Sequence, residues 1–358
     1  MTLPLPLFSA AQPLPTSTPA AAAAAAARAH RCKAPITALQ VDFDSLTPRA
    51  KGSFGDIFFA TLSDTREPIV LKRAGQARHS RKLLIAERNV NKSLNVKQPH
   101  PTHWPKFLGE TNHNSQSFLV WRGERSGVTT LHEMLFDRAP NALPVALGLP
   151  PSAALSARTA APVLHVALFK LLTDALLRAV REVHRSGFVH RDIKPQNILV
   201  TRATAPSAPH RLKLIDFGSA KNMQPWATMT DRTPVTLDPL FGAPERGGVL
   251  FNAASKQLKT KFDVFSIGMI AVAAAVPALR GESQLRMFRS ALERCDYDLE
   301  LLEAQWRRNG GGGGDAAPLF ACTAPTEVAL KSLVRSMLRK QPHNRASVQT
   351  ALYRLQRL

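Results

Sequence analysis

Residues 190–200 read His-Arg-Asp-Ile-Lys-Pro-Gln-Asn-Ile-Leu-Val, and this stretch decides the fold class. Asp192, Lys194 and Asn197 stand in it at short fixed offsets, just ahead of an apolar run typical of a buried strand. A loop that enters a strand can direct a carboxylate, an ammonium group and an amide oxygen into one cleft. Phosphoryl transfer needs these three groups: an acceptor for the proton of the attacking hydroxyl, a cation near the moving group and an oxygen ligand for a metal.

A second polar motif follows the next apolar run. Residues 212–215 are expected to form a strand, and they lead directly into Asp216-Phe217-Gly218. The tripeptide alone occurs by chance in many proteins. Its position 24 residues after Asp192, directly behind an expected strand, makes Asp216 a strong candidate for the same site.

Upstream, the segment 51–59 predicts a glycine turn between two strands. Gly52 and Gly55 would let backbone N–H groups approach phosphate oxygens without an intervening side chain. Taken alone, this segment fits an ordinary hairpin turn better. Its interpretation therefore depends on the residues that follow.

A lysine and a glutamate follow the glycine turn in the sequence, and their spacing matters for the interpretation. The apolar stretch 69–71 predicts a strand that ends in Lys72, and a charged helical stretch carries Glu87. Either residue alone would be interpreted as solvated. Their joint spacing with the motifs above favours a strand lysine oriented by a helix carboxylate, an arrangement that holds nucleotide phosphates.

Composition indicates a folded protein with a strong preference for anionic partners. The 358 residues are 44% hydrophobic, which is ample for a buried core, and 47 Lys and Arg against 26 Asp and Glu give a formal charge of +21. Nucleotides, nucleic acid, an anionic membrane face or an acidic protein substrate would all suit that charge. The three cysteines, Cys32, Cys295 and Cys322, form no close pair, so neither a disulfide framework nor a zinc site is expected.

The amino-terminal 41 residues contain no acidic residue and are rich in Ser, Thr and Pro, with eight consecutive alanines at 20–27. Together with Arg28, Arg31 and Lys33, this composition predicts an organellar transit peptide. The alternative is a low-complexity tail that carries no address.

Further along, the apolar run 264–279 has 16 residues and contains Pro277, whereas a membrane span needs about 20 apolar residues. It is therefore interpreted as a buried core helix. A second helix is expected over 168–183, ending before Gly187. The Ala- and Pro-rich segment 138–162 is expected to be a surface insertion.

Taken together, the motifs resemble those of eukaryotic-type protein kinases, namely the H-R-D-x-K-x-x-N loop, the D-F-G motif and the A-P-E motif. The resemblance covers about residues 48–358, and the lysine at 194 resembles serine/threonine rather than tyrosine kinases. It implies an α+β, two-lobed protein kinase fold, with ATP and Mg²⁺ as cofactors. A small β-rich lobe with one main helix would span 42–124 after the segment 1–41. A larger, mostly helical lobe would span 125–358, with inserts near 138–162, 201–210 and 309–315.

The resemblance also assigns roles. Asp192 would orient the substrate hydroxyl and accept its proton, and Lys194 would stabilise the transferred group. Asn197 and Asp216 would hold Mg²⁺. The residues that would bind ATP are Ala50, Gly52, Ser53, Phe54, Gly55, Ile57, Lys72 and Glu87. Those with structural or regulatory roles are Arg191, Glu245, Asp263 and Arg345, with Asp263 bracing the catalytic loop and Arg345 pairing with Glu245.

Residues 219–242 would form the activation segment. Arg191 is the kind of cation that pairs with a phosphorylated residue of such a segment. The available threonines are Thr228, Thr230, Thr233 and Thr236. One of them is a candidate regulatory phosphosite, and four solvated threonines are the alternative.

A narrower resemblance rests on 119–122, 237–239, 277–280 and 294–299, which are similar to the chloroplast state-transition and thylakoid protein kinases. It implies a chloroplast location, in the stroma or at the stromal face of the thylakoid, and protein substrates among light-harvesting or photosystem II proteins. Members that control state transitions carry an amino-terminal membrane span and a lumenal cysteine pair. This sequence shows neither feature, with only Cys32 in that region, so no transmembrane span is expected and thylakoid contact would be peripheral.

Two other functions remain open. A pseudokinase scaffold would bind nucleotide without turnover, and Ala50, which stands where the family has its first glycine, mildly favours it. A nucleic-acid-binding protein is suggested by the net charge and by seven basic residues after Glu327 with no acidic one. Basic patches usually prove to be solvated or substrate-docking faces, so no specific nucleic acid is expected as a partner.

Overall fold

The structure is a computed structural model, and it describes residues 40–51, 55–77, 79–124, 128–137, 142–149, 165–201, 211–223, 238–245, 256–308 and 324–358. All of them belong to one compact unit, Gln40–Leu358. Several sequence-based expectations lie outside the described residues. These are residues 1–39 of the expected transit peptide, which include Cys32, the turn residues Gly52, Ser53 and Phe54, the four threonines, Cys322 and the inserts near 201–210 and 309–315, apart from Thr201.

The small lobe, residues 40–124, is built on a five-stranded antiparallel sheet in the order β1-β2-β3-β5-β4. Its strands are β1 (Val41–Lys51), β2 (Gly55–Leu62), β3 (Pro68–Ala74), β4 (Phe107–His113) and β5 (Gln116–Arg122). The β-branched and aromatic residues of β3 and β5 suit a pleated, half-buried surface. The central strand β3 buries Ile69 and Leu71, and its register sets Lys72 opposite Ile57 on one side and Leu119 on the other.

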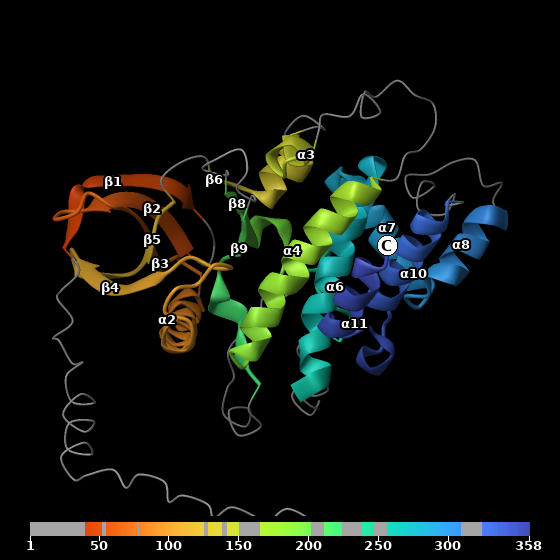
Figure 1. The fold of residues 1–358 in the computed structure, drawn as a ribbon. Coiled ribbons are helices and arrows are strands. Elements are labelled where there is room, and N and C mark those ends of the chain that lie inside the picture. The colour runs from red at the N-terminus through yellow and green to blue at the C-terminus, as the bar shows by residue number, and fades with distance from the viewer. Residues whose placement is uncertain are drawn as a thin grey trace, which may run out of the picture. The chain divides into compact units, whose positions relative to one another are not determined.

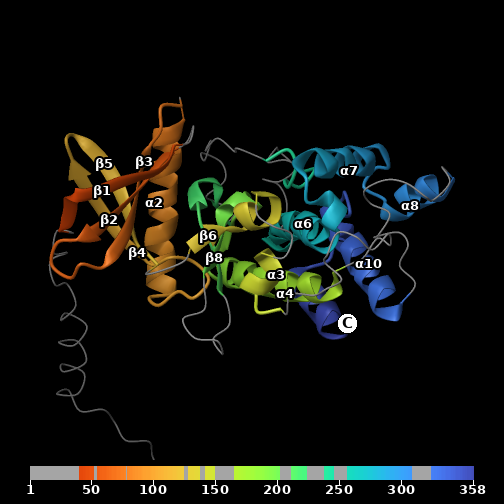
Figure 2. The same cartoon turned by 90° about the horizontal axis from the view of Figure 1, so that it is seen from above.

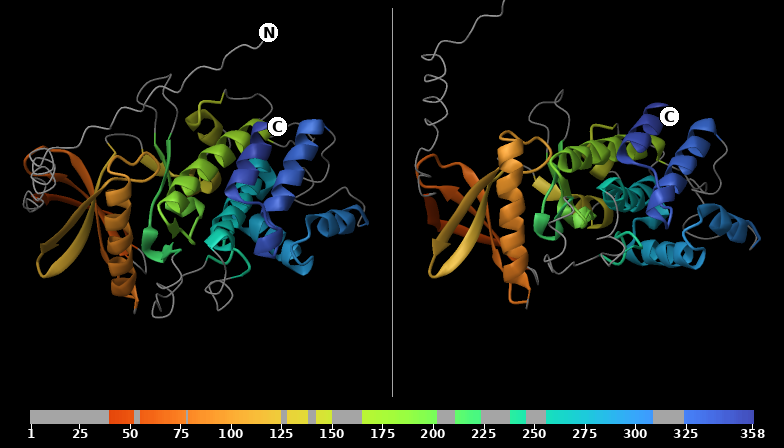
Figure 3. Two further views of the ribbon diagram at one scale, coloured as in Figure 1. Left: turned by 60° about the horizontal axis from the view of Figure 1, so that its bottom comes forward. Right: turned by 90° about the horizontal axis from the view of Figure 1, so that it is seen from below.

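One helix, α2 (Ser80–Lys97), covers this sheet. Leu83, Leu84, Val90 and Leu94 recur at helical spacing and form its buried stripe, together with the acidic Glu87. Figure 3 shows α2 between the sheet and the large lobe in both of its views. The helix therefore presents Glu87 where the two lobes meet.

The large lobe, residues 128–358, is mostly helical (Figure 1). Its helices are α3 (Ala142–Ala146), α4 (Val166–Arg185), α6 (Lys256–Ala275), α7 (Glu282–Arg294), α8 (Leu299–Arg308), α10 (Pro325–Met337) and α11 (Val348–Gln356). Short strands carry the polar motifs, and these are β6 (Val128–Thr130), β7 (Phe188–Val189), β8 (Ile198–Thr201), β9 (Arg211–Leu214) and β10 (Lys221–Asn222). Pairing in the order β6-β8-β9, and of β7 with β10, brings the two polar motifs side by side.

The core of the large lobe is the pair α4 and α6, which lie side by side in Figures 1 and 2. The side chains of α6 from Phe262 onward are almost completely inaccessible on all sides, as expected for a core helix. The expected run is helical to Ala275 and ends in a 3₁₀ turn at Pro277–Leu279, where proline cannot continue the helix. Across the described ranges, no helix has both the length and the apolarity needed to cross a bilayer.

The helix α4 presents one apolar face to this core. Leu168, Leu172, Leu176 and Val180 are fully buried along it. The chain leaves α4 through Gly187, whose φ of 86° lies in the left-handed region that glycine adopts without strain. This turn directs the chain into β7 and the loop that carries Asp192.

Part of the expected surface insertion, 138–162, differs from the expectation. Residues 142–146 form the helix α3, and Leu143 and Leu147 are buried in the core of the large lobe. Alanine and proline dominate the segment, so its two inward leucines were too few to reveal a helical period. The described portion, 142–149, is thus partly core rather than only surface.

The packing of α4 allows a matched test of the fold. Replacing the fully buried Leu172 with alanine should lower the free energy of unfolding by about 2–5 kcal/mol, because the lost methyl groups leave a cavity. The neighbouring Leu171 is 41% exposed, and Leu171→Ala should lower it by less than about 1 kcal/mol. Urea unfolding followed by far-ultraviolet circular dichroism measures both variants, and equal losses would contradict this assignment of the core face.

Candidate active site

The loop between β7 and β8 is anchored by Asp263 of α6. Its carboxylate accepts hydrogen bonds from the backbone N–H groups of His190 at 3.0 Å and Arg191 at 2.8 Å, and lies 2.8 Å from Nε2 of His184. Arg191 has a φ of 67°, in the left-handed region that costs a non-glycine residue free energy. Burial alone would raise the pKa of Asp263, but the hydrogen bond and charge of His184 hold it below the usual range. An ionised Asp263 therefore fixes the loop in a strained shape.

This anchor places Asp192 at the floor of the site. Oδ2 of Asp192 lies 3.0 Å from Nζ of Lys194 and accepts a 2.8 Å hydrogen bond from Nδ2 of Asn197. Oδ1 of Asp192 is buried and has no hydrogen-bond partner among the described residues. Burial raises the pKa of Asp192 above its usual range, although the Lys194 ammonium opposes this. A buried acceptor without a donor is suited to a hydroxyl supplied by another molecule.

Lys72 links the two lobes. Its ammonium donates to Oε2 of Glu87 at 2.8 Å and to Oδ1 of Asp216 at 2.9 Å. Burial would lower the pKa of Lys72, but the Asp216 and Glu87 carboxylates more than offset this and raise it. Lys72 thus remains a cation although its residue is only 8% exposed.

Glycine at position 55 makes room for Lys72. A Cβ added to Gly55 would lie 2.7 Å from Cε of Lys72, closer than such atoms approach in proteins. The sequence indicated Gly55 only as a site of backbone approach to phosphate. The structure adds that a side chain here would displace the lysine.

Of the other residues expected near ATP, Ala50 and Ile57 pair with each other across β1 and β2. The backbone of β1 is irregular between Pro48 and Ala50. The tip of the turn between the two strands lies outside the described residues.

Asp216 follows β9 with a φ of 60°, a second left-handed residue of the site. The next residue, Phe217, is buried, with its ring centroid 4.8 Å from that of His190 and 6.3 Å from that of Trp104. Burial alone would raise the pKa of Asp216, but the Lys72 ammonium lowers it. The packing of Phe217 thus keeps an ionised Asp216 turned toward the small lobe.

The oxygen atoms near this point fit a magnesium ion. Nδ2 of Asn197 makes both of that side chain's hydrogen bonds, to the backbone and side-chain oxygens of Asp192, so Oδ1 of Asn197 has no partner among the described residues. A carboxylate from Asp216 and an amide oxygen from Asn197 are hard ligands of the kind Mg²⁺ prefers. Because Mg²⁺ is usually held by one or two protein groups together with phosphates, Asp216 and Asn197 are the candidate ligands on the protein side.

Glu245 and Arg345 form the expected pair. Arg345 donates to Oε1 and Oε2 of Glu245 at 2.6 and 2.8 Å, an arrangement with two parallel charge-assisted bonds. Arg191, the expected partner of a phosphorylated threonine, donates through Nε to the carbonyl of Ser219 at 2.7 Å.

Sequence reasoning missed three side chains that support the site. His184 contacts Asp263, His190 lies 3.1 Å from the carbonyl of Ile215, and Lys97 donates to the carbonyl of Ser186 at 2.7 Å, which ties the end of α2 to the large lobe. The sequence did indicate that His184 points inward, because it lies one helical turn after Val180 on the buried face of α4. No sequence signal distinguishes Lys97 from the other lysines of α2.

The basic carboxyl-terminal region is largely neutralised. Five of the seven basic residues after Glu327 form ion pairs with acids elsewhere in the chain, and these are Lys331, Arg335, Arg339, Lys340 and Arg345. This pairing lowers the positive field that favoured the nucleic-acid alternative. Arg354 and Arg357 make no ion pair among the described residues.

Comparison with known proteins agrees with this geometry. The family model described as "Protein kinase domain" matches residues 152–354. The serine/threonine-protein kinase STN7, chloroplastic, of Arabidopsis thaliana is 32% identical over 157 residues, which cover 39% of this chain and 26% of that protein. The serine/threonine-protein kinase STN8, chloroplastic, of the same plant is 31% identical over 157 residues, 39% of this chain and 29% of that protein.

A third relative, glycogen synthase kinase 1 of Pyricularia oryzae, is 28% identical over 234 residues, 65% of this chain and 50% of that protein. The matched part of the chain thus spans between about a quarter and a half of these relatives. The family model covers more than half of the chain, and the structure has the β-sheet small lobe and helical large lobe expected from the sequence. The chain therefore belongs to the protein kinase domain family.

Proposed function

We propose that the chain is a protein serine/threonine kinase that transfers the γ-phosphoryl group of ATP to a protein hydroxyl. One observation carries this proposal, namely the buried Oδ1 of Asp192, which has no donor among the described residues. The neighbouring ion pairs support it, with Lys194 beside the same carboxylate and Lys72 held between Glu87 and Asp216. Catalysis by such a site consists mainly of positioning and charge stabilisation.

In the proposed step, the substrate hydroxyl donates to Oδ1 of Asp192, which orients it and accepts its proton. The hydroxyl oxygen forms a bond to the γ-phosphorus while the bond to the β–γ bridging oxygen breaks, and ADP leaves. Lys194 stabilises the charge of the transferred group, and Lys72 orients the phosphates. Magnesium, which Asn197 and Asp216 would hold, neutralises phosphate charge when bound.

Removing the proposed base tests the activity directly. With the full chain, Mg²⁺ and labelled ATP, Asp192→Asn should transfer at least about 100-fold less phosphate than wild type to a thylakoid extract or a generic basic protein. Asp174→Asn is the matched control, because Asp174 is part-exposed on α4 and pairs only with Arg178 among the described residues. Equal labelling by wild type and Asp192→Asn would contradict the proposed role. If ATP binds but wild type transfers no phosphate, the chain is a pseudokinase.

The environment of Asp192 also predicts a pH dependence. Burial raises its pKa, and only the ionised carboxylate can accept a proton, so the loss of activity on the acid side should be centred above the ordinary Asp value of about 3.9. The Lys194 ammonium lowers that pKa. As the pH is lowered, the activity of Lys194→Gln should therefore fall at a higher pH than the activity of wild type. Profiles of kcat/KM from pH 4 to 8, each normalised to its own maximum, measure this fall on the acid side for wild type and for Lys194→Gln. If the two normalised profiles coincide on the acid side, this explanation is contradicted.

We further propose a plastid location, with a transit peptide at 1–41, a small lobe over 42–124 and a large lobe over 125–358. The acid-free amino terminus supports this, as do the two chloroplastic relatives. The proposed substrates are thylakoid proteins, reached through peripheral contact with the stromal face. A fluorescent protein fused after Leu358 should accumulate in chloroplasts, whereas a fusion that lacks residues 1–41 should not. Cytosolic fluorescence from the full-length fusion would refute the plastid address.

A further inference from the structure

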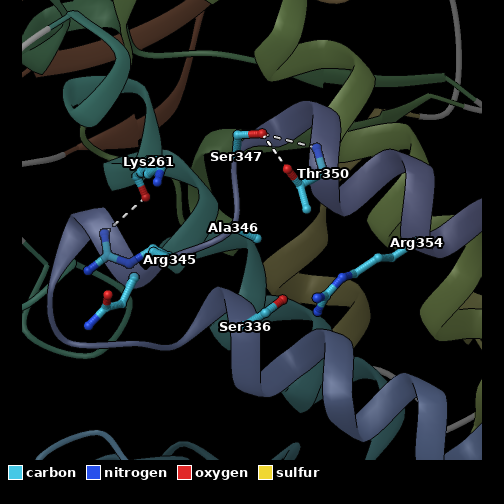
Figure 4. A pocket seen from close by; sticks show the side chains of 8 residues that line it. Lys261, Ser336, Arg345, Ala346, Ser347, Thr350 and Arg354 are labelled. Atoms are coloured by element: carbon cyan, nitrogen blue, oxygen red, sulfur yellow. Dashed lines mark hydrogen bonds between the residues drawn. The ribbon is translucent and has the colours of Figure 1, made fainter.

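A cavity of about 310 Å³ lies in the large lobe, where the ends of three helices meet. The beginning of α6, the end of α10 and the first turns of α11 contribute to its wall. Figure 4 shows Arg354 reaching from α11 toward Ser336 of α10, with Ser347 and Thr350 on another side. Of the residues expected at the Asp192 site, only Arg345, in its structural pairing with Glu245, also lines this cavity.

The charged side chains of this wall are all basic. Lys261, Arg345 and Arg354 line the cavity, and no acidic side chain does. Arg345 has its charge matched by Glu245, and its five N–H groups all donate to that carboxylate or to backbone carbonyls. The positive charge left to the cavity therefore comes from Lys261 and Arg354.

Both of these cations retain donors. Among the described residues, the Lys261 ammonium makes one hydrogen bond, to the carbonyl of His343 at 3.2 Å, and the guanidinium of the exposed Arg354 makes none. Burial and the charge of Arg345 together lower the pKa of Lys261, as expected where a cation lacks an anion. An anion in the cavity would relieve that repulsion.

The remaining wall also suits an anion. Ser347 caps α11 by accepting from the backbone N–H of Thr350 at 3.0 Å, and the two hydroxyl oxygens lie 2.8 Å apart. The positive end of the helix dipole of this nine-residue helix therefore lies at the cavity. Hydroxyl groups and a helix amino terminus are the usual companions of basic side chains in phosphate sites.

We propose that this cavity is a second ligand site, which binds a phosphate-type oxyanion through Arg354 and Lys261. Its volume is at the lower end of ordinary ligand sites and fits a phosphate group or a phosphorylated side chain rather than a whole nucleotide. The ligand is either free phosphate or a phosphate ester on a protein, and both present the same dianion.

Two arginines on α11 provide a matched test. Arg354 lines the cavity, whereas Arg357 lies outside it and donates to the hydroxyl of Tyr353 at 2.5 Å. Arg354→Gln and Arg357→Gln remove the same charge from the same exposed surface. Calorimetric titration of the full chain with inorganic phosphate, in buffer of constant ionic strength, should show binding that Arg354→Gln weakens at least about tenfold. Arg357→Gln should bind as wild type does, and Arg354→Lys should restore part of the affinity.

Equal affinities for Arg354→Gln, Arg357→Gln and wild type would overturn the proposal, because phosphate would then be bound elsewhere, for example at the nucleotide site. The proposal would also be overturned if no binding is seen at phosphate concentrations up to about 20-fold above the weakest dissociation constant that the calorimeter can measure. A second titration compares a phosphothreonine peptide with its unphosphorylated form. If the phosphopeptide binds more tightly than phosphate and its binding is weakened by Arg354→Gln, the ligand is a phosphate ester on a protein. If only the binding of inorganic phosphate is weakened by Arg354→Gln, the ligand is the free anion.

Discussion

The rest of the site depends on the two ion pairs made by the ammonium group of Lys72. This ammonium is buried between a carboxylate of the small lobe, Glu87, and one of the large lobe, Asp216. Removing one partner of a buried ion pair leaves an uncompensated charge and costs roughly 3–5 kcal/mol. The strand register at β3, the position of α2 and the glycine at position 55 all serve to keep this ammonium in place.

The large lobe contributes a second constraint, the carboxylate of Asp263. It is completely buried and accepts hydrogen bonds from two successive backbone N–H groups of the loop that carries Asp192. Left-handed residues such as Arg191 and Asp216 each cost of order 1–3 kcal/mol, so they persist only where the surroundings fix them. The core helix α6, which carries Asp263, therefore connects the hydrophobic core of the large lobe to the geometry of the site.

The sequence predicted those contacts that lie within or between short motifs. The pairs Lys72–Glu87 and Glu245–Arg345 and the bracing role of Asp263 were expected from fixed offsets and from resemblance to a family, and the structure places these residues together. Contacts that depend on how helices pack could not be predicted. The buried leucines of α3 and the ion pairs between α8 and α10 result from packing between segments that are separated in the sequence, and no local motif marks them. The cavity beside Arg354 arises in the same way, because its walls come from segments far apart in the sequence.

The most direct test of the central claim compares two lysines that both pair with carboxylates near the meeting of the lobes. Lys72 holds Glu87 and Asp216, whereas Lys213 of β9 pairs with Glu124 away from the proposed chemistry. The measurement is kcat/KM for ATP in phosphoryl transfer by wild type, Lys72→Met and Lys213→Met, with folding checked by circular dichroism. We expect a loss of at least about 100-fold for Lys72→Met and less than about tenfold for Lys213→Met, since only Lys72 is proposed to position the phosphates. Unchanged kcat/KM for folded Lys72→Met would contradict this expectation.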